Sequence, residues 1–235
     1  MRTVLCLGFA IAVTGLSLGC GNSDEQYQPA PVWSGRKPSL PAPPEKLNLP
    51  PIKVGEAFTV AGAAHQLRSR LHEKDVTKTS ITIQGYIVAE NITDAPSCAI
   101  VRVGKKEADD CVAEIPSFYI ADERDAGADK PRIRVLGWAN NFAAVHDAME
   151  RYRALKEVKD PTKDLVKDKL WDVAVPFPLP AVGAKVKVTG KYGFTFTKAS
   201  TGIVSDPTNG VMTYEKMETL EPAPQKVSFK NPPAR

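Results

Sequence analysis

Histidine and cysteine are frequent catalytic bases, nucleophiles and metal ligands, and this chain has few of either. Its three histidines are His65, His72 and His146. None stands in an HExxH pattern; His65 and His72, seven residues apart, offer two ligands on a helix face without the third that a zinc site needs. No GxSxG, Walker A or GxGxxG motif occurs. The sequence therefore predicts no catalytic residue, no metal site and no cofactor, with an enzyme lacking a local signature as an alternative.

Acidic residues gather between two of the predicted strands. They are Asp122, Glu123, Asp125 and Asp129. Carboxylate oxygens of this kind are the ligands that calcium prefers, but the spacing departs from that of an EF-hand loop. Because acidic and glycine residues are also typical of turns, a solvated turn is the simpler interpretation.

Aromatic residues and cations occur together in two parts of the chain. They are Tyr119, Arg134 and Trp138 in the first part and Phe194, Phe196 and Lys198 in the second. Aromatic rings beside cations stack on bases in proteins that bind single strands. Alternating aromatics in a small β-domain are also used for core or hairpin packing, so both interpretations are open.

The first twenty residues have the profile of a secretory signal. Arg2 is followed by an apolar run that ends in small residues. This run is shorter than the about 20 apolar residues that a transmembrane helix needs. Its end, Leu16-Ser-Leu-Gly-Cys20, resembles the lipobox of bacterial lipoproteins. The resemblance implies cleavage after residue 19 and acylation of Cys20, with a diacylglycerol on the thiol and a palmitate-like chain on the amine, which together anchor the chain firmly to a membrane.

The remaining cysteines predict a disulfide. Cys6 is removed with the signal and Cys20 carries lipid, which leaves Cys98 and Cys111. An even pair in an exported, oxidising compartment is expected to form a bond, worth about 3 kcal/mol in the chain-entropy model. Their spacing is not CxxC and no histidine lies nearby, which disfavours a metal or redox pair. After Cys20 the chain lacks the aspartate of inner-membrane retention signals, which favours the outer membrane, facing the periplasm or the exterior.

Proline is concentrated near the amino end of the mature chain. Of 235 residues 20 are proline, and eight of these lie between residues 21 and 51. Such a segment buries too little apolar surface to order itself. We therefore expect a signal peptide over 1–19, a flexible tether over 20–51, a folded domain over 52–221 and a proline-containing tail over 222–235. The net charge of +4 is too weak and too mixed to indicate a nucleic-acid binder.

Periodicity predicts mainly strands within the folded domain. Alternating apolar residues predict strands over 79–89, 115–122, 132–138, 183–192 and 211–220. Apolar residues three and four apart predict a helix over 142–156, with Asn140 or Asn141 as its N-cap. A short strand from Phe58 and a modest helix over 63–72 precede them. Gly85 and Gly190 stand inside strands where a small barrel must bend.

This order of three strands, a helix and two strands resembles the OB-fold, a five-stranded Greek-key barrel. The pieces 83–88, 118–122 and 183–192 are similar to OB-fold domains of the tRNA-anticodon-binding-like superfamily and to periplasmic bacterial OB-fold proteins. The resemblance implies a mainly β fold, a β-barrel with a helix between strands three and four and a short helix before the first strand. It also implies a ligand face on strands two and three, framed by residues 91–114 and 193–210. The candidate residues of this face are Tyr119, Arg134, Trp138, Phe194, Phe196 and Lys198. A generic α+β domain with a meandering sheet is the alternative.

Together these patterns predict a non-enzymatic, lipid-anchored protein of the bacterial cell envelope. Its partners are expected to be the membrane, through the lipid on Cys20, and an envelope protein or cell-wall component bound by the OB-fold-like domain. An exported lipoprotein seldom meets nucleic acid, so nucleic acid is not the expected partner. A module for single-stranded nucleic acid or an oligosaccharide is the alternative.

Overall fold

The computed structural model describes residues 50–101, 110–199 and 202–231. The predicted signal peptide, the lipidation site Cys20 and the tether up to residue 49 lie outside the described residues. So do residues 232–235 at the end of the predicted tail.

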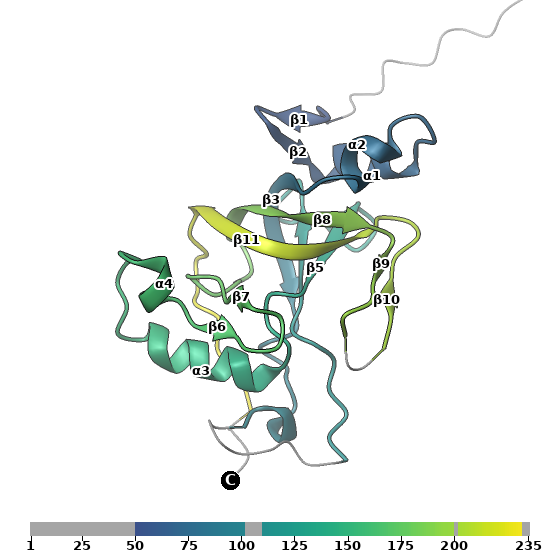
Figure 1. The fold of residues 1–235 in the computed structure, drawn as a ribbon. Helices are drawn as coiled ribbons and strands as arrows, with labels where there is room; N and C mark the ends of the chain where they lie inside the picture. Colours follow the sequence, from purple (N-terminus) through teal and green to yellow (C-terminus); the bar gives the residue numbers. More distant parts are fainter. Residues whose placement is uncertain (1–49, 102–109, 200–201, 232–235) are drawn as a thin grey trace, which may run out of the picture. The chain divides into compact units, whose positions relative to one another are not determined.

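Five strands pair with one another in a ring, drawn in Figure 1. They are β3 (Ile81–Glu90), β4 (Phe118–Ala121), β5 (Arg132–Leu136), β8 (Lys185–Gly193) and β11 (Val211–Glu221). Their order is β3-β4-β5-β11-β8, and β8 pairs again with β3. The β5–β11 pairing is parallel and the other four are antiparallel. The domain is therefore mainly β with a large mixed sheet, and all five strands predicted from alternation are present.

Two short strands and two helices precede the ring. They are β1 (Lys53–Val54), β2 (Ala57–Thr59), α1 (Val60–Arg68) and α2 (Glu73–Thr77). Strand β2 pairs in parallel with β3 outside the ring, and β1 pairs with β2. Five of the seven strands of this sheet therefore form the ring, and β1 and β2 extend the sheet beyond it. Helix α1 starts three residues before the predicted helix because the Thr59 hydroxyl accepts a hydrogen bond from the Gly62 N–H at 2.9 Å.

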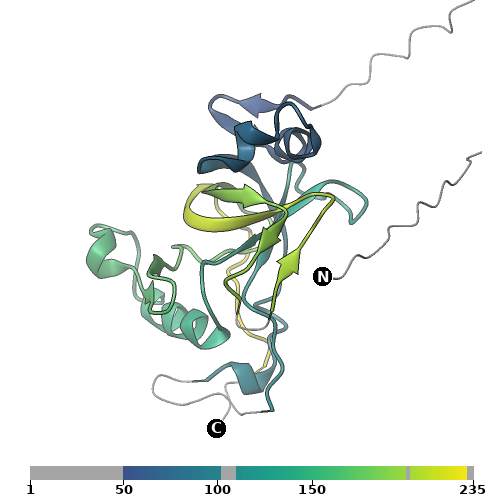
Figure 2. The same cartoon turned by 45° about the vertical axis from the view of Figure 1, so that its right-hand side comes forward.

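The connection from β5 to β8 carries the longest of the described helices. It holds α3 (Phe142–Tyr152), α4 (Pro161–Asp164), β6 (Lys167–Asp168) and β7 (Val173–Ala174). Asn141 is the N-cap of α3, because its side chain accepts from the Ala144 N–H at 2.9 Å. Figures 1 and 2 show α1 and α2 at one end of the ring and α3 toward the other. Small pieces complete the fold: the 3₁₀ turn η1 (Ser97–Ala99) and the hairpin of β9 (Thr195–Phe196) with β10 (Val204–Ser205).

The core fills the ring with the inward-facing residues of its strands. The largest fully buried of these are Ile83, Ile87, Phe118, Ile120 and Ile133, and Trp138 joins them just beyond β5. Fully burying one such side chain contributes about 1.5–3 kcal/mol. Helix α3 adds Val145, Ala148 and Tyr152 to the same core.

The predicted disulfide is confirmed. Cys98 and Cys111 are bonded, with their Cα atoms 5.7 Å apart, well within the usual range for a disulfide. The bond closes the long connection between β3 and β4. Beside it Ala99 and Ile100 are buried against Phe142 of α3, so this connection is packed onto the domain.

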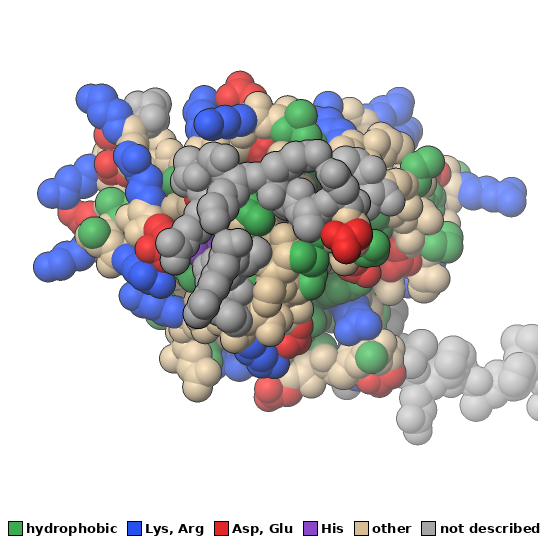
Figure 3. All heavy atoms as spheres, turned by 90° about the horizontal axis from the view of Figure 1, so that it is seen from below, with side chains coloured by type: hydrophobic (Ala, Val, Ile, Leu, Met, Phe, Trp, Pro, Cys, Tyr) green, Lys and Arg blue, Asp and Glu red, His purple; other side chains and the backbone are tan. Residues whose placement is uncertain are grey.

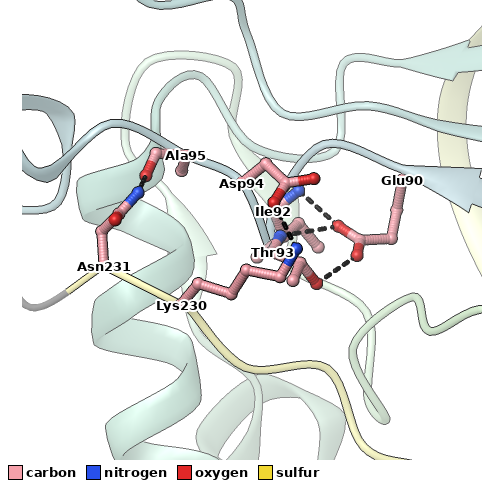
Figure 4. A network of polar contacts seen from close by, with 7 residues as sticks. All are labelled: Glu90, Ile92, Thr93, Asp94, Ala95, Lys230 and Asn231. Atoms are coloured by element: carbon pink, nitrogen blue, oxygen red, sulfur yellow. Dashed lines mark hydrogen bonds and ion pairs between the residues drawn. The ribbon is translucent and has the colours of Figure 1, made fainter.

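The described part of the predicted tail, residues 222–231, lies against the domain. Phe229 packs edge-on to Phe142, with ring centroids 6.5 Å apart, and is stacked with His146. Polar contacts also hold this segment at the end of β3 (Figure 4). Lys230 Nζ donates to Asp94 Oδ1 at 2.7 Å, and Asn231 Nδ2 donates to Ala95 O at 2.7 Å. Next to them, the Glu90 carboxylate accepts from the backbone N–H groups of Ile92 and Thr93. The packed part of the chain therefore extends beyond Glu221.

Candidate binding face

Tyr119 and Arg134 lie directly opposite each other on neighbouring strands β4 and β5. The inward positions of these strands are filled by core residues, so Tyr119 and Arg134 are on the outward face. The Arg134 guanidinium lies 5.7 Å from the centroid of the Tyr119 ring, and that of Arg132 lies 4.8 Å from it. Two guanidinium groups therefore engage one aromatic ring, in the range of cation–π attraction.

Arg134 is held by two further contacts. Its Nε donates to the Ser117 hydroxyl at 3.0 Å, and its Nη2 donates to Glu114 Oε2 at 2.6 Å. The Arg134 side chain is 16% exposed, whereas the Glu114 side chain is 73% exposed. The Arg132 side chain is half-buried and makes no hydrogen bond or ion pair with any residue that the structure describes. This arrangement is called the arginine face below: Tyr119, Arg132, Arg134, Ser117 and Glu114.

The structure separates the other four candidate residues from the arginine face. Trp138 is fully buried in the core, where it packs on Phe118 with ring centroids 6.2 Å apart. Phe196 is 1% exposed and packs edge-on against Trp171. Neither ring offers surface to a ligand, because each fills a position inside the protein.

Phe194 and Lys198 lie beside the hairpin that carries Phe196. Phe194 is half-buried against the main core, and Lys198 is exposed. Neither has a ring or cation–π contact with the arginine face among the described interactions. The hairpin covers outward residues of the sheet instead: Phe196 is packed with Leu136 of β5 and Val211 of β11. Of the six predicted residues, the structure brings together Tyr119 and Arg134.

Three members of the arginine face were not among the residues predicted from sequence. Arg132 was available to sequence reasoning, because it stands two residues before Arg134 and two-residue spacing places side chains on one face of a strand. Ser117 was available for the same reason, two residues before Tyr119. No local signal identifies Glu114, because it belongs to the irregular segment before β4 and meets Arg134 only through the fold.

A second tyrosine on the outward side of the sheet lies beside two cations that share one carboxylate. Arg124 and Lys185 each lie 5.2 Å from the ring of Tyr86 on β3. Glu221 pairs with both cations, at 3.1 Å from Arg124 and 3.3 Å from Lys185. The pKa of Lys185 lies above its ordinary value, mainly because its ammonium donates a hydrogen bond to Glu221. The cations around Tyr86 therefore already have an anion.

The acidic residues after β4 do not gather around a common point. Asp122 binds the start of α1: its two carboxylate oxygens accept from the Val60 N–H at 2.7 Å and the Ala61 N–H at 2.8 Å. Glu123, Asp125 and Asp129 are exposed. Across the described part of the chain, no group of three or more His, Cys, Asp or Glu residues is arranged to hold a metal ion.

The histidines are dispersed. Helix α1 ends at Arg68, so His65 and His72 do not share a helix face as the sequence allowed. His72 pairs with Asp75 at 3.3 Å, and His146 is stacked on Phe229. Burial raises the pKa of the neighbouring Asp147, and the proximity of His146 opposes this shift.

A polar groove of about 600 Å³ lies between the β1–β2 hairpin and the outward side of β3, β8 and β11. Its lysines and acids are Lys53, Lys187, Lys216, Glu56, Asp75 and Glu218. Ser80 donates to Glu215 at 2.6 Å beside it, and the Thr82 and Thr189 hydroxyls are paired at 2.8 Å. Neither histidine nor cysteine is among the described residues that line it, so its hydroxyls have no imidazole base.

Charges of both signs are interspersed on the face of the molecule that Figure 3 shows from below. Among the described helices, none is long and apolar enough to cross a membrane. Comparisons with models of protein families and with curated proteins found no match to this chain.

Proposed function

We propose that this chain is a lipid-anchored protein of the bacterial cell envelope, without catalytic activity, whose OB-fold-like domain binds an envelope component through the arginine face. The observation that carries the binding role is the cluster of two guanidinium groups on Tyr119, of which Arg132 has no carboxylate partner among the described residues. Unpaired arginines beside an aromatic ring are typical of recognition surfaces.

The strand order supports an OB-fold-like domain. Strands β3, β4 and β5 are consecutive antiparallel neighbours, and β8 returns to lie beside β3. The spatial order β8-β3-β4-β5 is that of a Greek key. Strand β11 completes the ring between β8 and β5, and α3 stands between the third and fourth ring strands. OB-folds bind ligands on their second and third strands, which correspond here to β4 and β5.

Two features favour a ligand other than nucleic acid. The Tyr119 ring is already engaged by Arg132 and Arg134, so it is not free to stack on a base. Both cations beside Tyr86 are already paired with Glu221, so they are less available to a phosphate backbone than unpaired cations would be. A protein or a cell-wall component fits this surface better.

Crosslinking in the intact envelope tests the binding role. A photoreactive amino acid at Ala89, which is paired with Tyr119 across β3 and β4, is expected to form covalent adducts. The same group at Leu170, which is exposed, is the matched control. We expect Arg132→Ala to reduce the yield of adducts at position 89 about tenfold, because a charge-assisted contact is lost. Equal adducts at positions 89 and 170, or none at 89, would remove the arginine face as a binding site.

The lipid anchor has its own test. With Cys20→Ala, the precursor is expected to keep its signal peptide and to lose the acyl chains, because the acylated thiol is absent. The measurement is the mass of the protein and its distribution between membrane and soluble fractions after mild alkaline extraction. Unchanged processing and acylation of the variant would contradict the lipobox interpretation, and Cys6→Ala is the control that should leave both unchanged.

A further inference from the structure

Arg134 is a mostly buried cation whose anion is mostly exposed. Its guanidinium is fixed from the inner side by the buried Ser117 hydroxyl. A cation withdrawn from water is costly without an anion, so Arg134 requires a carboxylate or its equivalent. Glu114, at 73% exposure, is largely hydrated already, so its carboxylate loses little when it turns into solvent. The anion on Arg134 is therefore required, but Glu114 is replaceable.

The neighbouring guanidinium has unused donors. The Arg132 guanidinium contacts the Tyr119 ring, and none of its N–H groups has a hydrogen-bond partner among the described residues. A guanidinium presents its N–H groups as a planar fork that matches a carboxylate. Two guanidinium groups with a single carboxylate, Glu114, leave the arginine face with an excess positive charge beside Tyr119.

We propose that Arg132 and Arg134 bind a carboxylate of an acidic glycan, and that Glu114 occupies Arg134 until this carboxylate replaces it. The inference rests on the proposed function, since it names the ligand class for the same face. The exchange is noncovalent: Arg134 keeps an anionic partner throughout, Glu114 moves into water, and the incoming carboxylate also reaches the free donors of Arg132. In the unliganded protein, Glu114 is an internal substitute for the ligand.

The composition of the face favours a glycan over a protein. Protein interfaces also use Tyr and Arg as anchors, but at their centre these side chains become buried among apolar and other aromatic residues. Ala121 and Val211, which lie opposite Arg132 and Arg134, are buried, and the Tyr119 ring is already engaged, so this face offers little apolar surface. A polar chain with a carboxylate and hydroxyl groups on successive sugars can pair with guanidinium donors without needing apolar contact area.

Calorimetric titration of the full mature chain in detergent micelles tests the proposal. The probe is an oligogalacturonide, in which each sugar carries a carboxylate, and its methyl ester is the uncharged control. We expect the free acid to bind and the ester not to bind. Glu114→Gln is expected to tighten binding of the acid about threefold, because the competing anion is removed. Arg132→Gln is expected to weaken it about tenfold.

Arg124→Gln is the matched control for charge. It removes the same net charge from the outward surface, but Arg124 belongs to the Tyr86 cluster and is paired with Glu221. Binding by this variant should equal that of the unaltered protein. Equal losses in the Arg124 and Arg132 variants would overturn the proposal, since the attraction would then be non-specific. So would equal binding of acid and ester, or a Glu114→Gln variant that binds no more tightly.

Two further probes distinguish other anions. Tighter binding of poly-L-glutamate than of the oligogalacturonide would replace the glycan with an acidic protein segment, and tighter binding of single-stranded DNA would replace it with a phosphate polymer. Either result overturns the glycan proposal. If adducts form at position 89 in the envelope but the oligogalacturonide does not bind in the titration, the envelope-binding role stays in place. Only the ligand class proposed here is then removed.

Discussion

Replacing Gly190 with alanine is expected to destabilise the domain by about 3 kcal/mol or more, because the new methyl group would overlap the main chain of the adjacent strand. A Cβ at this position falls well inside contact distance of the Thr213 carbonyl oxygen on β11. A flexible side chain could move away, but this neighbour is backbone in the longest strand pairing of the ring. The pairing has a β-bulge between Tyr214 and Lys216, next to the partner of Gly190. The close approach is therefore part of the bend that closes the ring.

Urea unfolding followed by tryptophan fluorescence measures this effect, because Trp138 is fully buried. Gly193→Ala is the matched control in the same strand, since nothing lies within 4 Å of a Cβ built there. The control is expected to change the free energy of unfolding by about 0.5 kcal/mol or less. If Gly190→Ala matches the control, β8 and β11 do not approach each other as closely as this structure has them. A folded domain of ordinary stability, about 5–15 kcal/mol, would tolerate the control, and at the lower end of that range the test variant would keep only about 2 kcal/mol.

The strands of the ring were predictable because their apolar residues repeat at a period that only a strand provides. Ile81, Ile83 and Ile87 all face inward, and the polar residues between them face outward. The small strands were not predictable: β6, β7, β9 and β10 have two residues each, too few to display a period. Their pairing depends on tertiary contacts such as the packing of Phe196 over Leu136.

The candidate site was predictable only in part. Alternation places Tyr119 and Arg134 on outward faces, but it does not tell which outward positions are later covered by another segment. Phe196 shows this limit, since the hairpin that carries it turns back onto the sheet and buries it. Glu114 and Asp122 show a related limit, because their partners, Arg134 and the start of α1, are distant in sequence and become neighbours only in the folded domain.

Asp168→Ala is expected to cost about 3 kcal/mol of stability, because three backbone N–H groups would lose their acceptor. The Asp168 side chain is 1% exposed. Its Oδ2 accepts from Asn140 N at 2.7 Å, and its Oδ1 accepts from Leu170 N at 3.0 Å and from Trp171 N at 2.9 Å. These contacts join the segment before α3 to the β6–β7 hairpin. Asp168→Asn keeps one acceptor oxygen, so a smaller loss is expected.

Hydrogen exchange separates this effect from general destabilisation. In Asp168→Ala, the exchange rates of the Asn140, Leu170 and Trp171 amides should increase more than those of other buried amides. The control is Asp129→Ala, at an exposed residue with no hydrogen bond or ion pair among the described residues. This control should leave the exchange of all three amides unchanged. Trp171 packs on Phe196, and Phe196 shares a cluster with Ile115, which adjoins Glu114. Loss of the Asp168 contacts should therefore also loosen the segment that holds Glu114. If the three amides keep their protection, the carboxylate is not what holds this loop, and the packing of Trp171 on Phe196 must hold it instead.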